Sequence, residues 1–167
     1  DMDGITRGSL AAIYSGRGEG YAPCTAQSCI EILKYFGIPV AGKRAVVIGR
    51  SLVIGKPVSM LLLNENATVT TCHSRSENLP QICREADIII AAAGKAAMVT
   101  KEYVKPGQTV LDVGIHVDDE GNMCGDTAFA EIEPIVDAIT PVPGGVGSVT
   151  TAILASHVIE AAEKVAK

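Results

Sequence analysis

An alternation of strands and helices between residues 45 and 91 constrains the fold of this chain more than any other feature. Strand-forming and helical stretches follow one another at residues 45–48, 55–64, 68–72, 78–85 and 88–91. Nearly continuous apolar strands joined by helices are typical of a parallel sheet that is covered on both faces, because right-handed crossovers carry the helices over the sheet. The segment therefore predicts β-α-β-α-β units.

Neighbouring segments extend this pattern. Residues 109–113 read as a further strand, and the turn-forming residues 118–122 predict a hairpin at an edge of the sheet. A helix is expected from Thr25, a suitable N-cap, to Gly37, a suitable C-terminal stop. We expect an α/β fold: a Rossmann-like, doubly wound, mostly parallel sheet with helices on both faces.

The two ends of the chain differ from this central part. Residues 1–22 are rich in glycine and predict only a short helix near residues 10–14, ended by Gly16, Gly18 and Gly20. Residues 149–166 predict a helix that should pack against something apolar. Its apolar side consists of Ile153, Leu154, Val158, Ile159, Ala162 and Val165.

Composition narrows the class of protein. The 167 residues suffice for one domain and a small appendage, and 47% hydrophobic with 20% charged residues is ordinary globular composition. The net charge of −5 argues against a nucleic-acid partner, and no apolar run approaches the ~20 residues that span a membrane. Because the chain starts at Asp1 without a leader, we expect a fragment.

Five scattered cysteines without a CxxC pair indicate neither a disulfide framework nor a metal site. They fit a reducing, cytoplasmic compartment.

Residues 49–57, Gly-Arg-Ser-Leu-Val-Ile-Gly-Lys-Pro, join a strand to a helix. Such a junction directs free backbone N–H groups and the positive end of a helix dipole at one point, which suits a pyrophosphate. Gly49 and Gly55 would allow tight turns and a close approach to the ligand. The spacing departs from G-x-G-x-x-G, so an ordinary βα turn is an equally good interpretation of the spacing alone.

The end of the second strand indicates which dinucleotide is bound. NAD-specific domains commonly place an acidic residue there, whereas this strand ends in Cys72, His73, Ser74 and Arg75. The guanidinium groups of Arg50 and Arg75 suit a 2′-phosphate, which favours NADP. The alternatives are a solvated surface charge for Arg75 and a partly buried polar residue for His73.

Together with residues 140–147, Thr-Pro-Val-Pro-Gly-Gly-Val-Gly, this loop resembles the bifunctional methylenetetrahydrofolate dehydrogenase/methenyltetrahydrofolate cyclohydrolase family. The resemblance covers nearly the whole chain, including residues 1–4, 23–25, 112–115 and 125–126. It implies oxidation of 5,10-methylenetetrahydrofolate by hydride transfer to NADP, followed by hydrolysis to 10-formyltetrahydrofolate. It also implies tetrahydrofolate derivatives as partners and a homodimer as the intact protein.

The resemblance implies a role for particular residues. Asp3 would orient the pterin ring, although it can also be read as a turn residue. Pro141, Pro143, Gly144 and Gly145 would form a wall of the cleft between two domains, or merely an irregular connection. The cofactor contacts would be Gly49, Arg50, Ser51, Gly55, Ser74, Arg75 and Ile115.

The resemblance also implies three regions: residues 1–24 as the end of an N-terminal folate-binding α/β catalytic domain, 25–148 as the NADP-binding domain, and 149–167 as a helix packing toward the N-terminal domain. The family commonly has proline where this chain has Ala26 and Pro-Met where it has Ser148-Val149. Both departures lie near the expected domain junction.

The family's catalytic lysine lies in a Tyr-x-x-x-Lys motif, and none of the four tyrosines here is followed by lysine at that spacing. We therefore expect that this polypeptide alone does not complete the reaction cycle, because it was truncated or has lost catalysis. Two alternatives are a non-catalytic NADP-binding module of the same fold and another Rossmann oxidoreductase, against which the Pro-Gly-Gly motif argues.

Overall fold

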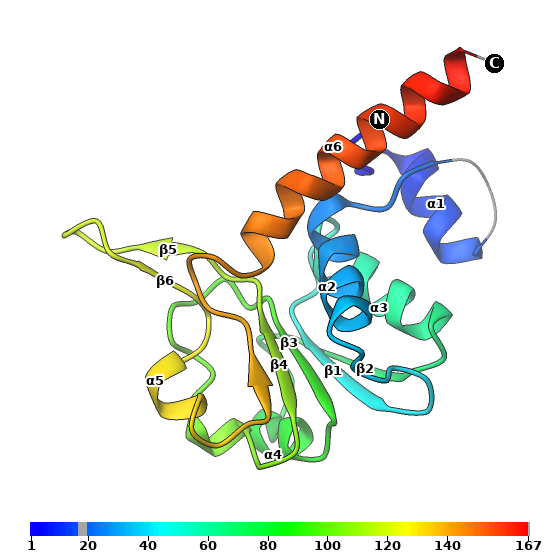
Figure 1. The fold of residues 1–167 in the computed structure, drawn as a ribbon. Helices are drawn as coiled ribbons and strands as arrows, with labels where there is room; N and C mark the ends of the chain where they lie inside the picture. Colours follow the sequence, from blue (N-terminus) through cyan, green and yellow to red (C-terminus); the bar gives the residue numbers. More distant parts are fainter. Residues whose placement is uncertain (17–19, 167) are drawn as a thin grey trace.

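A computed structural model describes residues 1–16 and 20–166 (Figure 1). Its centre is a sheet of five parallel strands in the order β2-β1-β3-β4-β7. The strands are β1 (Arg44–Ile48), β2 (Thr68–Cys72), β3 (Ile88–Ala91), β4 (Thr109–Asp112) and β7 (Ala138–Ile139). The parallel α/β architecture predicted from the sequence is confirmed.

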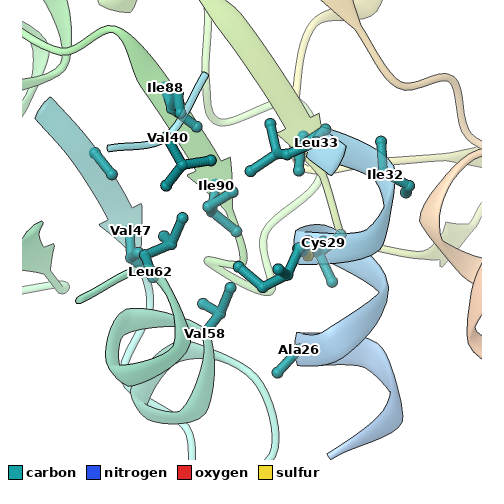
Figure 2. Close-up of a cluster of buried hydrophobic side chains, with 14 of the residues drawn as sticks. Ala26, Cys29, Ile32, Leu33, Val40, Val47, Val58, Leu62, Ile88 and Ile90 are labelled. Carbon is teal, nitrogen blue, oxygen red and sulfur yellow. The ribbon is translucent and has the colours of Figure 1, made fainter. Parts of the chain in front are cut away.

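Alternate strand residues enter two different cores, which explains the helices on both faces. Val47 and Ile90 pack toward α2 (Cys24–Tyr35) and α3 (Gly55–Asn64), as Figure 2 shows. The opposite core contains residues of the same strands, such as Val46 and Ile89. It is covered by α4 (Leu79–Arg84), the 3-10 helix η1 (Lys101–Tyr103) and α5 (Phe129–Ile132). Complete burial of such side chains stabilises the fold by about 1.5–3 kcal/mol each.

Helix α2 begins earlier than expected. Pro23, not Thr25, occupies the N-cap position, and Thr25 lies inside the helix. The backbone N–H of Gln27 donates to the carbonyl of Pro23 at 2.9 Å, so the fixed φ of proline starts the helix where no side-chain cap is present. The predicted stop at Gly37 is confirmed: its φ is +65°, and the N–H groups of Gly37 and Ile38 donate to carbonyls of the last turn.

The predicted hairpin exists, but it is not an edge of the main sheet. Strands β5 (His116–Val117) and β6 (Met123–Cys124) form a separate antiparallel ribbon that projects from the body (Figure 1). The expected position was wrong because β7 pairs with β4 and occupies that edge. Two residues of strand are too few to give a recognisable pattern in a sequence.

The N-terminal helix α1 (Arg7–Ser15) ends at Gly16, as expected, with Gly16 in the left-handed conformation. Gly18 lies outside the described residues.

Helix α6 (Val146–Val165) begins three residues before the expected position and packs along α2 (Figure 1). Its packed side contains Val146, Val149 and His157. Much of the predicted apolar side is instead exposed: Leu154, Val158, Ile159 and Val165. No helix among the described residues has the length and apolar character needed to cross a bilayer.

Candidate functional site

The carboxyl ends of β1, β2 and β3 border a cleft of about 690 Å³. Strand β1 lies between the other two, so the chain leaves it toward β2 and later returns on its opposite side. Ligands of parallel α/β sheets bind at such a reversal of strand order. The residues that line the cleft are Ile48, Gly49, Arg50, Ser51, His73, Ser74, Ser76, Asn78, Leu79, Pro80, Ala92, Ala93, Lys95, Met98 and Tyr103.

Gly49 and Gly55 are required by close backbone contacts. Gly49 has a φ of +133°, and a Cβ there would lie 2.1 Å from the carbonyl oxygen of Ala92. A Cβ at Gly55 would lie 2.2 Å from the carbonyl oxygen of Gly49. The loop is therefore folded tightly onto the start of α3 and onto the end of β3, as the glycine spacing predicted.

Ser51 holds the same loop in shape. Its Oγ accepts hydrogen bonds from the backbone N–H groups of Ile54 at 3.1 Å and Gly55 at 3.4 Å. Within the described part of the chain, the N–H groups of residues 50–53 donate no hydrogen bond to the protein. These donors lie just before the N-terminus of α3, where the helix dipole is positive. The loop thus fits the pyrophosphate of a dinucleotide.

The polar end of β2 contributes only part of the predicted cation cluster. Ser74 and Arg50 line the cleft, whereas Arg75 is exposed and is not among the lining residues. The backbone N–H of Arg75 donates to Nδ1 of His73 at 3.2 Å, which fixes the imidazole in the cleft wall. The prediction for His73 as a partly buried polar residue therefore agrees with its position.

Lys95, Met98 and Tyr103 line the cleft but were not predicted. The signal for Lys95 was present in the sequence, because it follows β3 as Arg50 follows β1. Ligands of parallel sheets bind at the carboxyl ends of the strands, and the loop that carries Lys95 is at the carboxyl end of β3.

A second cleft of about 380 Å³ lies beside the end of β4. It brings together Ile115 and the predicted wall residues Pro141, Pro143, Gly144 and Gly145. The structure therefore groups Ile115 with these residues and not with the glycine loop. A Cβ at Gly145 would lie 2.3 Å from the carbonyl oxygen of Pro141, so glycine is needed for this turn.

Asp3 lies in neither cleft. It is exposed near Cys24, where burial and the Asp3 carboxylate raise the pKa of the Cys24 thiol. Asp3 does lie in a turn before Gly4, which agrees with the alternative interpretation given for it. The carboxylate of Asp1 accepts hydrogen bonds from the backbone N–H groups of Gly4 and Thr6 and from Ser9 Oγ.

The buried carboxylate of Asp112 holds together two loops behind the clefts. Asp112, 2% exposed, accepts hydrogen bonds from the N–H groups of Gly114, Asp126 and Thr127 and from Thr127 Oγ1 at 2.6 Å. Burial raises the pKa of Asp112, and these hydrogen bonds oppose the rise. A Cβ at Gly125 would lie 2.0 Å from Asp112 Oδ2, so the two loops cross in direct contact.

The family model of the tetrahydrofolate dehydrogenase/cyclohydrolase NAD(P)-binding domain matches residues 23–166. The bifunctional protein FolD of Carboxydothermus hydrogenoformans is 59% identical over 165 residues, which are 98% of this chain and 58% of that protein. The chain therefore spans less than two thirds of the length of this relative.

Solved structures agree with this match. The bifunctional FolD dehydrogenase/cyclohydrolase of Campylobacter jejuni superposes with a TM-score of 0.95 at 38% identity, over 98% of this chain and 58% of that one. The Trypanosoma brucei FolD enzyme, solved with NADP cofactor and an inhibitor, gives a TM-score of 0.88 at 37% identity, over 95% of this chain and 57% of that one.

Proposed function

Because the chain belongs to the tetrahydrofolate dehydrogenase/cyclohydrolase family, we propose that it is the NADP-binding part of an enzyme that converts 5,10-methylene- through 5,10-methenyl- to 10-formyltetrahydrofolate. The observation that carries the proposal is the glycine loop. Among the described residues, the N–H groups of residues 50–53 donate no hydrogen bond to the protein, and Arg50 and Ser51 of this loop line one cleft together with Ser74. When bound, NADP accepts the hydride. The protein's part is to bind and orient it.

The proposed preference for NADP over NAD rests on the end of β2. No carboxylate lines this cleft among the described residues, so nothing there would repel a 2′-phosphate. Ser74 supplies a hydroxyl at that position, Arg50 supplies a guanidinium from the loop after β1, and the exposed Arg75 directly follows Ser74 in sequence. Charge-assisted hydrogen bonds from arginine to phosphate are stronger than those between neutral groups.

The second cleft suits the reactive end of the cofactor and the folate. Ile115 supplies an apolar side chain, and Gly144 and Gly145 allow a ring to approach the backbone closely. We propose that this cleft holds the nicotinamide against the one-carbon bridge. Asp3 is proposed to orient the pterin.

We further propose that residues 1–24 are the end of a folate-binding catalytic domain, that residues 25–148 are the NADP-binding domain, and that residues 149–167 pack toward the folate-binding domain. The intact enzyme is proposed to be a cytoplasmic homodimer. The 167 residues contain no Tyr-x-x-x-Lys motif, so catalysis by this chain alone is not expected. A non-catalytic NADP-binding module is the second candidate, and dehydrogenase activity of the complete gene product distinguishes the two.

We expect this chain to bind NADP more tightly than NAD in calorimetric titrations. Arg50→Ala should raise the Kd for NADP by about 10- to 100-fold, because a charged phosphate contact contributes about 1.5–3 kcal/mol, and should leave NAD binding nearly unchanged. Arg75→Ala should have a smaller effect in the same direction. Arg44→Ala, at the opposite end of β1, is the control. Equal Kd values for NADP and NAD in the parent chain would contradict the proposed preference.

The exposed apolar side of α6 predicts that the isolated chain associates with itself. Val158 and Ile159 are 51% and 60% exposed, and such surfaces associate in water. We expect the isolated chain to self-associate in sedimentation experiments and Ile159→Lys to weaken that association about tenfold, which corresponds to ~1.4 kcal/mol. Ser156→Lys adds the same charge without removing apolar surface and should change it less. A monomeric parent chain would refute this role for α6.

A further inference from the structure

Asp126 is a completely buried carboxylate that connects three loops. Its Oδ2 accepts the N–H of Gly94 at 2.9 Å, and its Oδ1 accepts the N–H of Lys95 at 3.0 Å. Gly94 and Lys95 follow β3, and Lys95 lines the cofactor cleft. These two hydrogen bonds attach the backbone of this part of the cleft wall to the Asp126 carboxylate, in addition to the backbone bond from the Val99 N–H to the Asp126 carbonyl.

His116 completes the contacts of this carboxylate. Its Nε2 lies 2.7 Å from Asp126 Oδ1, and its side chain is 26% exposed. The preceding residue, Ile115, lines the second cleft. The Asp126 carboxylate thus connects His116 of β5 to the loop that carries Lys95.

Asp126 has little freedom to move. Its own N–H donates to Asp112 Oδ1 at 2.9 Å, and a Cβ at Gly114 would lie 2.2 Å from Asp126 Oδ1. The carboxylate is therefore fixed by its backbone on one side and by packing on another. A fixed acceptor of this kind holds the donors around it in one geometry.

We infer that Asp126 and His116 are positioning residues for the dinucleotide: they hold the Gly94–Lys95 backbone as the wall of the cleft that faces the glycine loop. The inference rests on the proposed NADP-binding function. Neither side chain lines the cofactor cleft, so both act through the loop. A wall that is held before binding lowers the entropy lost when the cofactor binds.

The test uses the 167-residue chain and two readouts. The first is the Kd for NADP by calorimetry, where His116→Ala should raise the Kd about tenfold through loss of a charge-assisted hydrogen bond. The second is amide hydrogen exchange by NMR without cofactor. His116→Ala should speed exchange at Gly94 and Lys95 about tenfold and leave Val113, whose N–H bonds to Ala91, unchanged.

Rescue separates positioning from general loss of structure. His116→Gln keeps a side-chain donor and should restore both the Kd and the slow exchange in large part. Val117→Ala, at an exposed position of the same strand, should alter neither readout. Asp126→Asn places amide hydrogens against a backbone donor and should reproduce the effect of His116→Ala or exceed it.

Several results would overturn the inference. If the parent chain binds NADP and His116→Ala leaves its Kd unchanged, the inference about His116 and Asp126 is overturned but the proposed function is not. This holds whether or not hydrogen exchange at Gly94 and Lys95 is faster. Failure of His116→Gln to restore binding also overturns it. A parent chain that does not bind NADP overturns the proposed function together with this inference.

Discussion

Gly49→Ala is expected to lower the free energy of unfolding by about 3 kcal/mol and to weaken NADP binding by about a hundredfold. The added methyl group would lie 2.1 Å from the carbonyl oxygen of Ala92 at a residue whose φ is +133°. Because the obstacle is backbone directly after β3, relief requires the ends of β1 and β3 to separate at the cleft. Urea denaturation and calorimetric titration measure the two effects.

Gly107→Ala is the matched control. Gly107 also has a positive φ, +85°, but no atom lies within 4 Å of the position of an added Cβ. It should cost only about 1–2 kcal/mol, through backbone strain, and leave NADP binding intact. Equal losses of stability in the two variants, or normal NADP binding by Gly49→Ala, would show that the close approach of the loop to β3 is not required.

Asp112→Asn is expected to lower the free energy of unfolding by about 3 kcal/mol at pH 7, because it leaves buried donors without their acceptor. Asp112 Oδ2 accepts both the N–H and the Oγ1 hydroxyl of Thr127. An amide group in that place would face the N–H with hydrogens of its own. Chemical denaturation measures the loss, and Asp118→Asn, at an exposed carboxylate that also accepts backbone N–H groups, is the control.

The loss of unfolding free energy caused by Asp112→Asn should depend on pH. Burial raises the pKa of Asp112 above its ordinary value of 3.8, so the folded state binds this proton more tightly than the unfolded state does. The stabilisation of the folded state by this tighter proton binding is complete below the pKa of Asp112 in the unfolded chain. It is lost as the pH rises through the pKa of Asp112 in the folded chain. The difference between the parent chain and Asp112→Asn should therefore shrink from pH 4 to pH 7. A constant or widening difference would contradict this.

The sequence predicted several residues that the structure brings together in the cleft at the ends of β1, β2 and β3, because this cleft is built from local features. Gly49, Arg50 and Ser51 follow a buried strand, and Ser74 follows the next one, so their positions relative to the sheet depend only on recognising the strands. Lys95 could have been found by the same reasoning. Arg75 shows the limit of that reasoning, since proximity in sequence to the strand end did not place it in the cleft wall.

Periodicity in the sequence alone determined the parallel α/β fold and the helices on both faces, and the glycines predicted a tight turn between β1 and α3, because these follow from patterns within about twenty residues. Only the tertiary structure decided which strand forms the edge of the sheet and which side of α6 is packed. It also decided that Asp126 lies beside Gly94, Lys95 and His116. Those contacts join residues distant in sequence, and their energies depend on burial that appears only once the chain has folded.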